Sequence, residues 1–284
     1  MKVGIQLYSV RNSLKEAPLD TLKAVAAAGY KYVEFANGNT TEDPGSGFGL
    51  PANEMKAFLD ANGMAVVGAH LSPLDPDNLD KIIEYHQAVG NTRVGWAMGF
   101  FNSMDQIKEN AELFNKLGEK FHKAGIQLYY HNHFQEFREF DGKPALYHLA
   151  ELTEPENLGF ELDTFWCRRG GYDPIEVMDH LGSRVILLHQ KDFWKDSPDD
   201  VQYLGKVIPN NTEITFEHFR VAANPDNFVE IGTGILPIQS YIDKGNEIGV
   251  KFVVLEQDHT KLGEIKSIEV SMESFRKFNG IEFA

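Results

Sequence analysis

Two imidazoles, an amide and a carboxylate directly follow one short apolar segment of this chain. Residues 126–130 have the composition of a β-strand, and the next six residues read HNHFQE, so that His131, His133 and Glu136 follow the strand closely. Such groups lose hydration when they are buried and then need partners. This stretch alone is equally compatible with the floor of a site and with histidines that hydrogen-bond a neighbouring loop.

Other apolar segments end in the same way. Segments 158–163, 185–189 and 252–256 end in Asp163, His189 and Glu256, and two earlier segments carry Glu34 and His70 near their ends. Solvated loops or helix faces would not place ionisable residues at so many strand ends. The pattern therefore indicates a functional site at one end of a sheet or barrel.

Carboxylates and imidazoles that converge in this way suit a divalent cation. Asp163, His189 and Glu256 are the best three candidate ligands, because each is the last residue of its strand. Glu136 is the best fourth, since it can fold back from its loop, and His131 competes for that position. Oxygen and nitrogen ligands without a thiolate favour Mn²⁺, Mg²⁺, Co²⁺ or Zn²⁺. We expect one such cation, Mn²⁺ before the others.

Strands and helices must alternate to bring these residues together. Eight apolar segments alternate with eight helical ones, of which the longest spans residues 103–123 with apolar residues at 3.6 spacing. Eight such units are typical of an α/β (β/α)8 TIM barrel, whose active site lies at the carboxyl ends of the strands. A doubly wound sheet would need a glycine-rich turn after the first strand, where this chain reads YSVR. We expect a single domain over residues 1–284, in which the long polar segment 192–228 is irregular and functional.

Composition excludes several classes of protein. The 284 residues are 42% hydrophobic and carry a formal net charge of −15, which argues against nucleic acid as a partner. The single cysteine, Cys167, cannot form an intrachain disulfide. No apolar run approaches the roughly 18 residues of a membrane span, and the start lacks the pattern of a signal peptide. We expect a soluble, cytoplasmic protein without a membrane partner.

The chain resembles the xylose isomerase-like TIM barrel superfamily, which is also described as sugar phosphate isomerases/epimerases. The similarity covers essentially the whole chain and rests on the order and spacing of several motifs. They are GYKYVEF at 29–35, GAH at 68–70, YHNHFQEF at 130–137, LDTFW at 162–166, LHQKD at 188–192, EIGTG at 230–234 and LEQD at 255–258.

The resemblance implies a small sugar substrate and a metal bound by Glu136, Asp163, His189 and Glu256. The cation would polarise a sugar carbonyl while a side chain moves the neighbouring proton, as in an isomerase or epimerase. The chain departs from the familiar epimerases at His131, where they carry a glutamate. The branch with this His-Asn-His signature resembles inosose dehydratases and lyases that cleave 3-keto-glycosides, so β-elimination is the alternative.

These roles are hypotheses that follow from the resemblance. His133 or His131 would be the base, and Glu256 would be both a ligand and a second acid or base. Substrate contacts would come from four residues: His70, Trp96, Lys191 and Glu34. Packing in the core is the alternative for Trp96.

Four further possibilities remain open. An endonuclease IV-like repair enzyme would need more metal ligands and a basic groove, and a non-catalytic sugar-binding module would not need the metal ligands at all. The turn Gly232-Thr233-Gly234 before a helix could hold a phosphate. A homo-oligomer or a partner subunit is compatible with the sequence.

Overall fold

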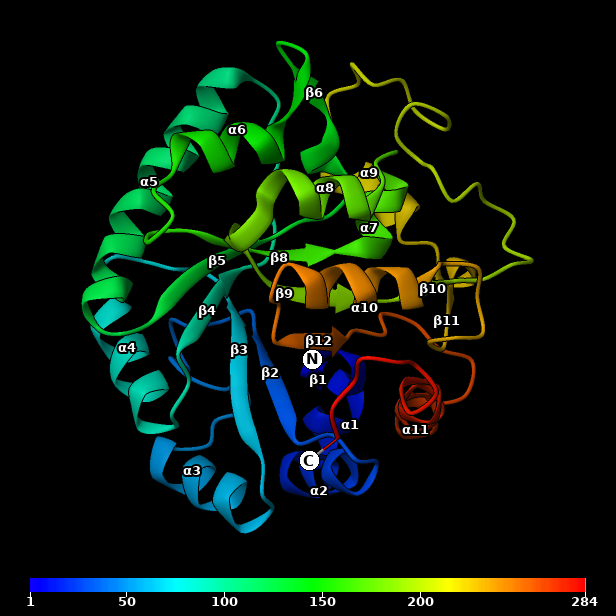
Figure 1. The fold of residues 1–284 in the computed structure, drawn as a ribbon. Helices are drawn as coiled ribbons and strands as arrows, with labels where there is room; N and C mark the ends of the chain where they lie inside the picture. The colour runs from blue at the N-terminus through cyan, green and yellow to red at the C-terminus, as the bar shows by residue number, and fades with distance from the viewer. Residues whose placement is uncertain (284) are drawn as a thin grey trace.

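Eight short strands rich in Val, Ile and Leu pair in parallel and close into a barrel (Figure 1). The computed structural model describes residues 1–283. Strand β1 closes the barrel because it pairs with β2 on one side and with β12 on the other. In their order around the barrel the strands are β1 (Lys2–Gln6), β12 (Phe252–Leu255), β9 (Val185–Gln190), β8 (Gly159–Asp163), β5 (Gln127–His131), β4 (Arg93–Trp96), β3 (Ala65–Leu71) and β2 (Tyr32–Asn37). The predicted (β/α)8 barrel is confirmed.

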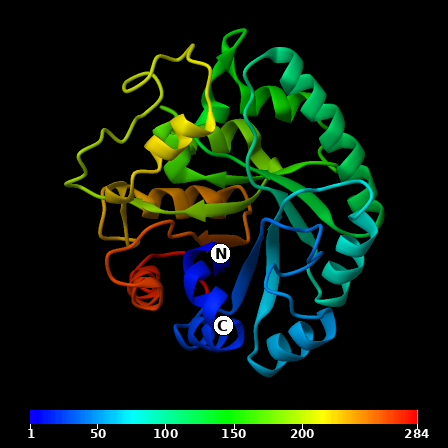
Figure 2. The same cartoon turned by 180° about the vertical axis from the view of Figure 1, so that it is seen from behind.

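Helices surround the barrel and bury one apolar face each against it (Figures 1 and 2). The longest, α5, begins after Ser103, whose side chain accepts a hydrogen bond from the backbone N–H of Gln106 at 3.2 Å, as expected of an N-cap. Gly118 lets α5 pack closely against the backbone of Asn157, because an added Cβ would lie 2.0 Å from the carbonyl oxygen of Asn157. The main helices are α2 (Pro18–Ala27), α3 (Ala52–Ala61), α4 (Leu79–Ala88), α5 (Met104–Lys123), α6 (Ala145–Leu152), α8 (Pro174–Leu181), α10 (Ile238–Glu247) and α11 (Glu264–Phe275).

Shorter elements complete the fold, and most of them follow the strands at the end of the barrel where the polar residues lie. They are the helices α1 (Arg11–Glu16), α7 (Thr164–Arg169) and α9 (Phe216–Ala222), the hairpin β6 (Glu139–Phe140) with β7 (Lys143–Pro144), the pair β10 (Asp192–Phe193) with β11 (Phe228–Val229), and the 3₁₀ turns 7–10, 135–137, 182–184 and 225–227. Met1 lies beside the last part of the described chain, since its amino group donates to the carbonyl oxygen of Gly280 at 2.7 Å.

The segment 192–228 is less irregular than the sequence suggested. The antiparallel pair β10–β11 closes its base, and the segment extends beyond the barrel in yellow-green and yellow in Figures 1 and 2. Arg169, which is fully buried, donates to the backbone carbonyls of Asp200 and Val201. Helix α9 lies within the segment, and the expectation of an irregular excursion was wrong for this part of it.

The turn Gly232-Thr233-Gly234, which the sequence suggested for phosphate, already binds a side-chain carboxylate. The backbone N–H groups of Gly232, Gly234 and Leu236 donate to the carboxylate of Asp192 at 2.9–3.1 Å. A phosphate would have to displace that carboxylate, so the turn offers no support for a phosphate site. Within residues 1–283, no helix combines the length and apolar character that crossing a membrane requires.

One buried histidine of the helical layer predicts how stability depends on pH. His86 of α4 is fully buried, and burial lowers its pKa from 6.5 to about 3. The unfolded chain binds this proton near pH 6.5, whereas the folded protein binds it only near pH 3. Acidification therefore favours the unfolded chain over this interval, by about 1.4 kcal/mol per pH unit.

We expect His86→Gln to remove about 2 kcal/mol of the destabilisation between pH 7 and pH 5, measured by urea unfolding at both values. The exposed His122 supplies the matched control, and His122→Gln should leave the pH dependence unchanged. An unaltered pH dependence in His86→Gln would contradict the prediction.

Candidate active site

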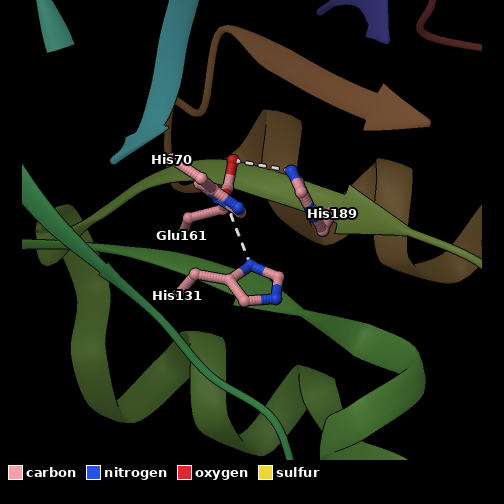
Figure 3. A group of neighbouring side chains, drawn as sticks. All are labelled: His70, His131, Glu161 and His189. Atoms are coloured by element: carbon pink, nitrogen blue, oxygen red, sulfur yellow. Dashed lines mark hydrogen bonds and ion pairs between the residues drawn. The ribbon is translucent and has the colours of Figure 1, made fainter. Parts of the chain in front are cut away.

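Three imidazoles from three strands surround the carboxylate of Glu161 (Figure 3). His70 Nε2 lies 2.7 Å from Glu161 Oε2, His131 Nδ1 lies 3.1 Å from the same oxygen, and His189 Nε2 lies 3.1 Å from Oε1. Burial alone would raise the pKa of Glu161, but the charge of His189 and the hydrogen bonds from the imidazoles hold it well below its usual value. Glu161 is therefore an anion in the barrel interior.

A second group of side chains overlaps the first. His131, Asp163, His189 and Glu256 each offer one ligand atom, and these atoms all lie within 4.8 Å of one another. The ammonium group of Lys191 donates to both Asp163 and Glu256. Burial would raise the pKa of Glu256, but Lys191 and His189 hold it well below its usual value. Both groups contain His131 and His189, so the two candidate cation positions are alternatives or close neighbours.

His189 carries a positive charge in this network. Its Nδ1 lies 3.1 Å from Glu256 Oε2, and its Nε2 lies 2.6 Å from Glu34 Oε2. Burial alone would lower the pKa of His189, but the carboxylates of Glu161, Glu34 and Glu256 outweigh it and raise the pKa well above its usual value. A metal ligand must be neutral imidazole, so a cation bound here would release the proton of His189.

His131 and His133 are neutral, in contrast to His189. Burial lowers the pKa of His131 to about 4. Burial also lowers the pKa of His133 well below its usual value, and the neighbouring His131 and Lys191 lower it further. Within the described chain, Nδ1 of His133 has no hydrogen-bond partner although it is buried. The ring packs edge-on against Phe219 at 4.9 Å and borders the cavity. His133 is therefore unprotonated and borders the cavity, so it is placed to accept a proton from a bound molecule.

Glu136 does not lie with the other predicted ligands. Its carboxylate accepts hydrogen bonds from the hydroxyl of Tyr130 at 2.6 Å and from the backbone N–H of His133 at 2.8 Å. Burial raises its pKa to about 7. Among residues 1–283 it belongs to neither group of potential ligands, and His131, its competitor for the fourth position, is in both. The 3₁₀ turn at 135–137 directs the Glu136 side chain back to its own loop, where it orients the backbone of His133.

The residues predicted to contact substrate occupy different positions. His70 lines the cavity. Glu34 and Lys191 are almost completely buried among the charged groups and are not among the residues that line it. Trp96 donates from Nε1 to the carbonyl oxygen of Met98 at 2.7 Å and packs edge-on against Phe114, as in the alternative of core packing.

Sequence reasoning missed Glu161, although a signal for it existed. Residues two apart on a strand point to the same side, so Glu161 must share the barrel interior with Asp163. A charged residue within the apolar strand β8 needs a partner, and His70, His131 and His189 supply it. Asp258 was also missed; it lines the cavity, and burial raises its pKa to about 7.

A cavity of about 1020 Å³ opens above these groups. Its polar floor consists of His70, His131, His133, Glu256 and Asp258. The floor lies at the carboxyl ends of strands β3, β5 and β12, which is where the active sites of such barrels lie. A bound molecule would therefore meet neutral imidazole and carboxylate together.

A barrel with this floor belongs to a known class of proteins. Residues 22–278 match the family model described as xylose isomerase-like TIM barrel, and the chain belongs to that family. It is 25% identical over 181 residues to an inosose dehydratase of Mesomycoplasma hyopneumoniae (strain 7448), which covers 60% of this chain and 54% of the relative. The chain thus spans about half the length of this curated relative.

Solved structures show the same fold. A sugar phosphate isomerase/epimerase from Parabacteroides distasonis ATCC 8503 superimposes with a TM-score of 0.77 at 23% identity, covering 99% of this chain and 95% of that one. The IolI protein with a bound zinc atom superimposes with a TM-score of 0.66 at 16% identity, covering 97% and 96%. At these identities the likeness establishes the fold alone.

The buried ammonium group of Lys191 gives a prediction for stability. Lys191→Met would leave Asp163 and Glu256 without their shared cation, which typically costs about 3–5 kcal/mol for a buried pair. We expect a loss of this size in urea unfolding with a chelator present. Lys195→Met changes a lysine whose side chain is 68% exposed and should cost less than about 0.5 kcal/mol. Equal stability of the two variants would contradict the charge balance described above.

Proposed function

We propose that this protein is a divalent cation-dependent lyase that dehydrates a keto-sugar or a related cyclic polyol ketone. The observation that carries the proposal is His133, a neutral and buried imidazole whose Nδ1 has no partner within the described residues and whose ring borders the cavity. It lies beside a group of carboxylates and imidazoles that suits a cation. The similarity to an inosose dehydratase supports the same reaction class.

The residues present fit a divalent cation. His131, Asp163, His189 and Glu256 would hold it, with two nitrogens and two carboxylate oxygens, a set that suits Mn²⁺, Co²⁺ or Zn²⁺. When bound, such a cation would supply Lewis-acid polarisation of the substrate ketone. We propose Mn²⁺ first; the zinc of the IolI protein supports Zn²⁺ as the alternative.

Proton transfer would begin at His133. A ring nitrogen of His133 would accept the proton from the carbon next to the ketone, and the electron pair of that C–H bond would form the enolate. The enolate then expels the hydroxyl group on the next carbon, which takes up one proton and leaves as water. Glu256 at the cavity floor is ionised, since Lys191 and His189 hold its pKa well below its usual value, so the protonated His133 would supply this proton. Glu136 orients His133 through its backbone N–H.

Isomerisation or epimerisation is the second candidate, because it shares the step up to the enolate. Membership of the xylose isomerase-like TIM barrel family supports it. Two-faced proton exchange needs a second base opposite the first, and His131, where the familiar epimerases carry a glutamate, is directed to Glu161 instead. This arrangement favours elimination over epimerisation. The net charge of −15 remains the argument against the endonuclease IV-like alternative.

Metal content tests the proposed ligands. We expect the protein loaded with Mn²⁺ and desalted to retain about one equivalent, measured by mass spectrometry of the metal. Asp163→Asn and Glu256→Gln should each weaken binding by at least about tenfold, since each removes a charged ligand. Glu136→Gln is the matched control and should retain the metal. The Glu161→Gln variant distinguishes the two groups of potential ligands. If Glu161→Gln loses the metal and Asp163→Asn retains it, the cation is bound by His70, His131, Glu161 and His189 instead.

Substitution of the proposed base tests the chemistry. His133→Gln should lower kcat for elimination by about 10²- to 10⁴-fold, the usual contribution of a positioned base, while its metal content stays that of the unmodified protein. Keto-sugars and inososes are incubated in D₂O, and mass spectrometry reports both deuterium exchange and loss of water. The exposed His180 provides the control variant His180→Gln. Exchange without loss of water would favour the isomerase or epimerase, and full activity of His133→Gln would exclude this residue as the base.

A further inference from the structure

The loop that follows β12 brings a carboxylate without a partner to the cavity. Asp258 lines the cavity together with Glu256, two residues before it. Within residues 1–283 the Asp258 carboxylate forms no ion pair and no hydrogen bond, and the buried ammonium group of Lys191 pairs with Asp163 and Glu256 instead. Both oxygens of Asp258 can therefore accept hydrogen bonds from a bound molecule.

The backbone around this carboxylate is held in place. The backbone N–H of Gln257 donates to the hydroxyl of Ser9 at 2.9 Å. The guanidinium of Arg11 donates to the carbonyl oxygen of Asp258 at 2.7 Å. The side-chain amide of Gln257 donates to the carbonyl oxygen of His259, also at 2.7 Å. Hydrogen bonds thus fix three consecutive residues of the loop, with Asp258 at their centre.

Helix α1, which supplies Arg11, is anchored to the same part of the chain. The carboxylate of Glu264 accepts hydrogen bonds from the backbone N–H groups of Asn12 and Ser13 at 3.1 and 2.8 Å, and from both of their side chains. Helix α1 and the loop after β12 therefore support each other. An acceptor held in this way loses little conformational freedom when a ligand binds, which favours affinity and selectivity.

The charges near Asp258 favour an uncharged donor as its ligand. Glu256 beside it is ionised, so a negatively charged substituent would be repelled here. Lys191 already supplies positive charge to the floor, which reduces the need for a cationic ligand. Hydroxyl groups are uncharged donors, and two of them on adjacent carbons of a sugar ring match the two oxygens of one carboxylate.

The cations on this side of the cavity do not replace Asp258 in that contact. Arg11 donates to the backbone carbonyls of Tyr8 and Asp258 at 3.0 and 2.7 Å. Lys15 also lines the cavity, and its ammonium group has no carboxylate partner in the described chain. Its side chain is exposed to solvent, whereas Asp258 is half-buried. Solvent screens an exposed ammonium group, so its attraction for a group that lies beside Asp258 is weak.

We propose that Asp258 is a specificity-determining residue that accepts hydrogen bonds from two adjacent, unsubstituted hydroxyl groups of the substrate. The inference rests on the proposed function, which assigns the cavity to a sugar or polyol ketone, and it narrows the substrate class. The ketone end would face His133, and the pair of hydroxyls would face the loop after β12. A substrate with a phosphate or another substituent on either hydroxyl would be rejected.

Unreactive glycosides test this contact without turnover. Methyl glucosides of both anomers lack the ketone, and calorimetry on the Mn²⁺-loaded protein compares them with analogues that each lack one ring hydroxyl. We expect the loss of either of two adjacent hydroxyls to weaken binding at least about tenfold, as is usual for a hydrogen bond to a charged group. In Asp258→Ala both of these ratios should fall toward unity.

Two further variants support the comparison. Asp258→Asn keeps the shape of the side chain and one acceptor oxygen, so it should retain at most one of the two penalties, and it decides the question if Asp258→Ala fails to fold. Asp20→Ala is the matched control, because the Asp20 side chain lies on α2 and is 77% exposed. It should leave all ratios unchanged.

Four outcomes would overturn the inference. They are the failure of both methyl glucosides to bind, penalties that persist in both Asp258 variants, penalties that disappear in Lys15→Met instead, and tighter binding of a methyl glucosaminide, whose ammonium group replaces a hydroxyl. Elimination from keto-sugars is measured separately. A lack of turnover with penalties that depend on Asp258 would contradict the proposed reaction alone, and turnover with penalties independent of Asp258 would contradict this inference alone.

Discussion

Four carboxylates buried at one end of the barrel are the constraint on which the rest of this site depends. Glu34, Glu161 and Asp163 are fully buried, and Glu256 is 7% exposed. Carboxylates removed from water need cations and hydrogen bonds nearby, because an uncompensated buried charge costs several kcal/mol. Lys191 and the protonated His189 supply the positive charge. The charged cluster is thus held together by mutual compensation and not by solvent.

The parallel barrel makes this concentration of charge possible. Strands β2, β3, β5, β8 and β9 each contribute one or two acidic or imidazole side chains to the interior. The closed ladder fixes their separation, as the pairing of Asp163 with His189 across β8 and β9 illustrates. Neutral and charged imidazoles coexist within a few ångströms for the same reason. His131 and His189 have ring centres 4.6 Å apart, yet the carboxylates face His189 from several sides and burial dominates at His131.

The sequence was informative where a residue's role follows from its strand. Asp163, His189 and Glu256 could be predicted because a strand end fixes both position and direction, and all three lie in one group of potential ligands. Glu136 could not, since the 3₁₀ turn that returns its carboxylate to the Tyr130 hydroxyl and the His133 backbone has no counterpart in strand periodicity. Glu161 was predictable by alternation along β8 but was overlooked. The position of α9 beside the cavity could not be predicted, because α9 belongs to a long segment whose path no local pattern specifies.

Charge compensation also links cation binding to proton transfer. A divalent cation near His131, Asp163, His189 and Glu256 would add positive charge to a cluster that is already balanced by Lys191 and by the proton on His189. Electrostatic balance then favours release of that proton, and neutral imidazole is the form that coordinates metal. Burial against Trp166 and Phe219 is the largest cause of the lowered pKa of His133, and His131 and Lys191 lower it further. The barrel thus keeps the candidate base neutral whether or not the charged cluster gains a cation.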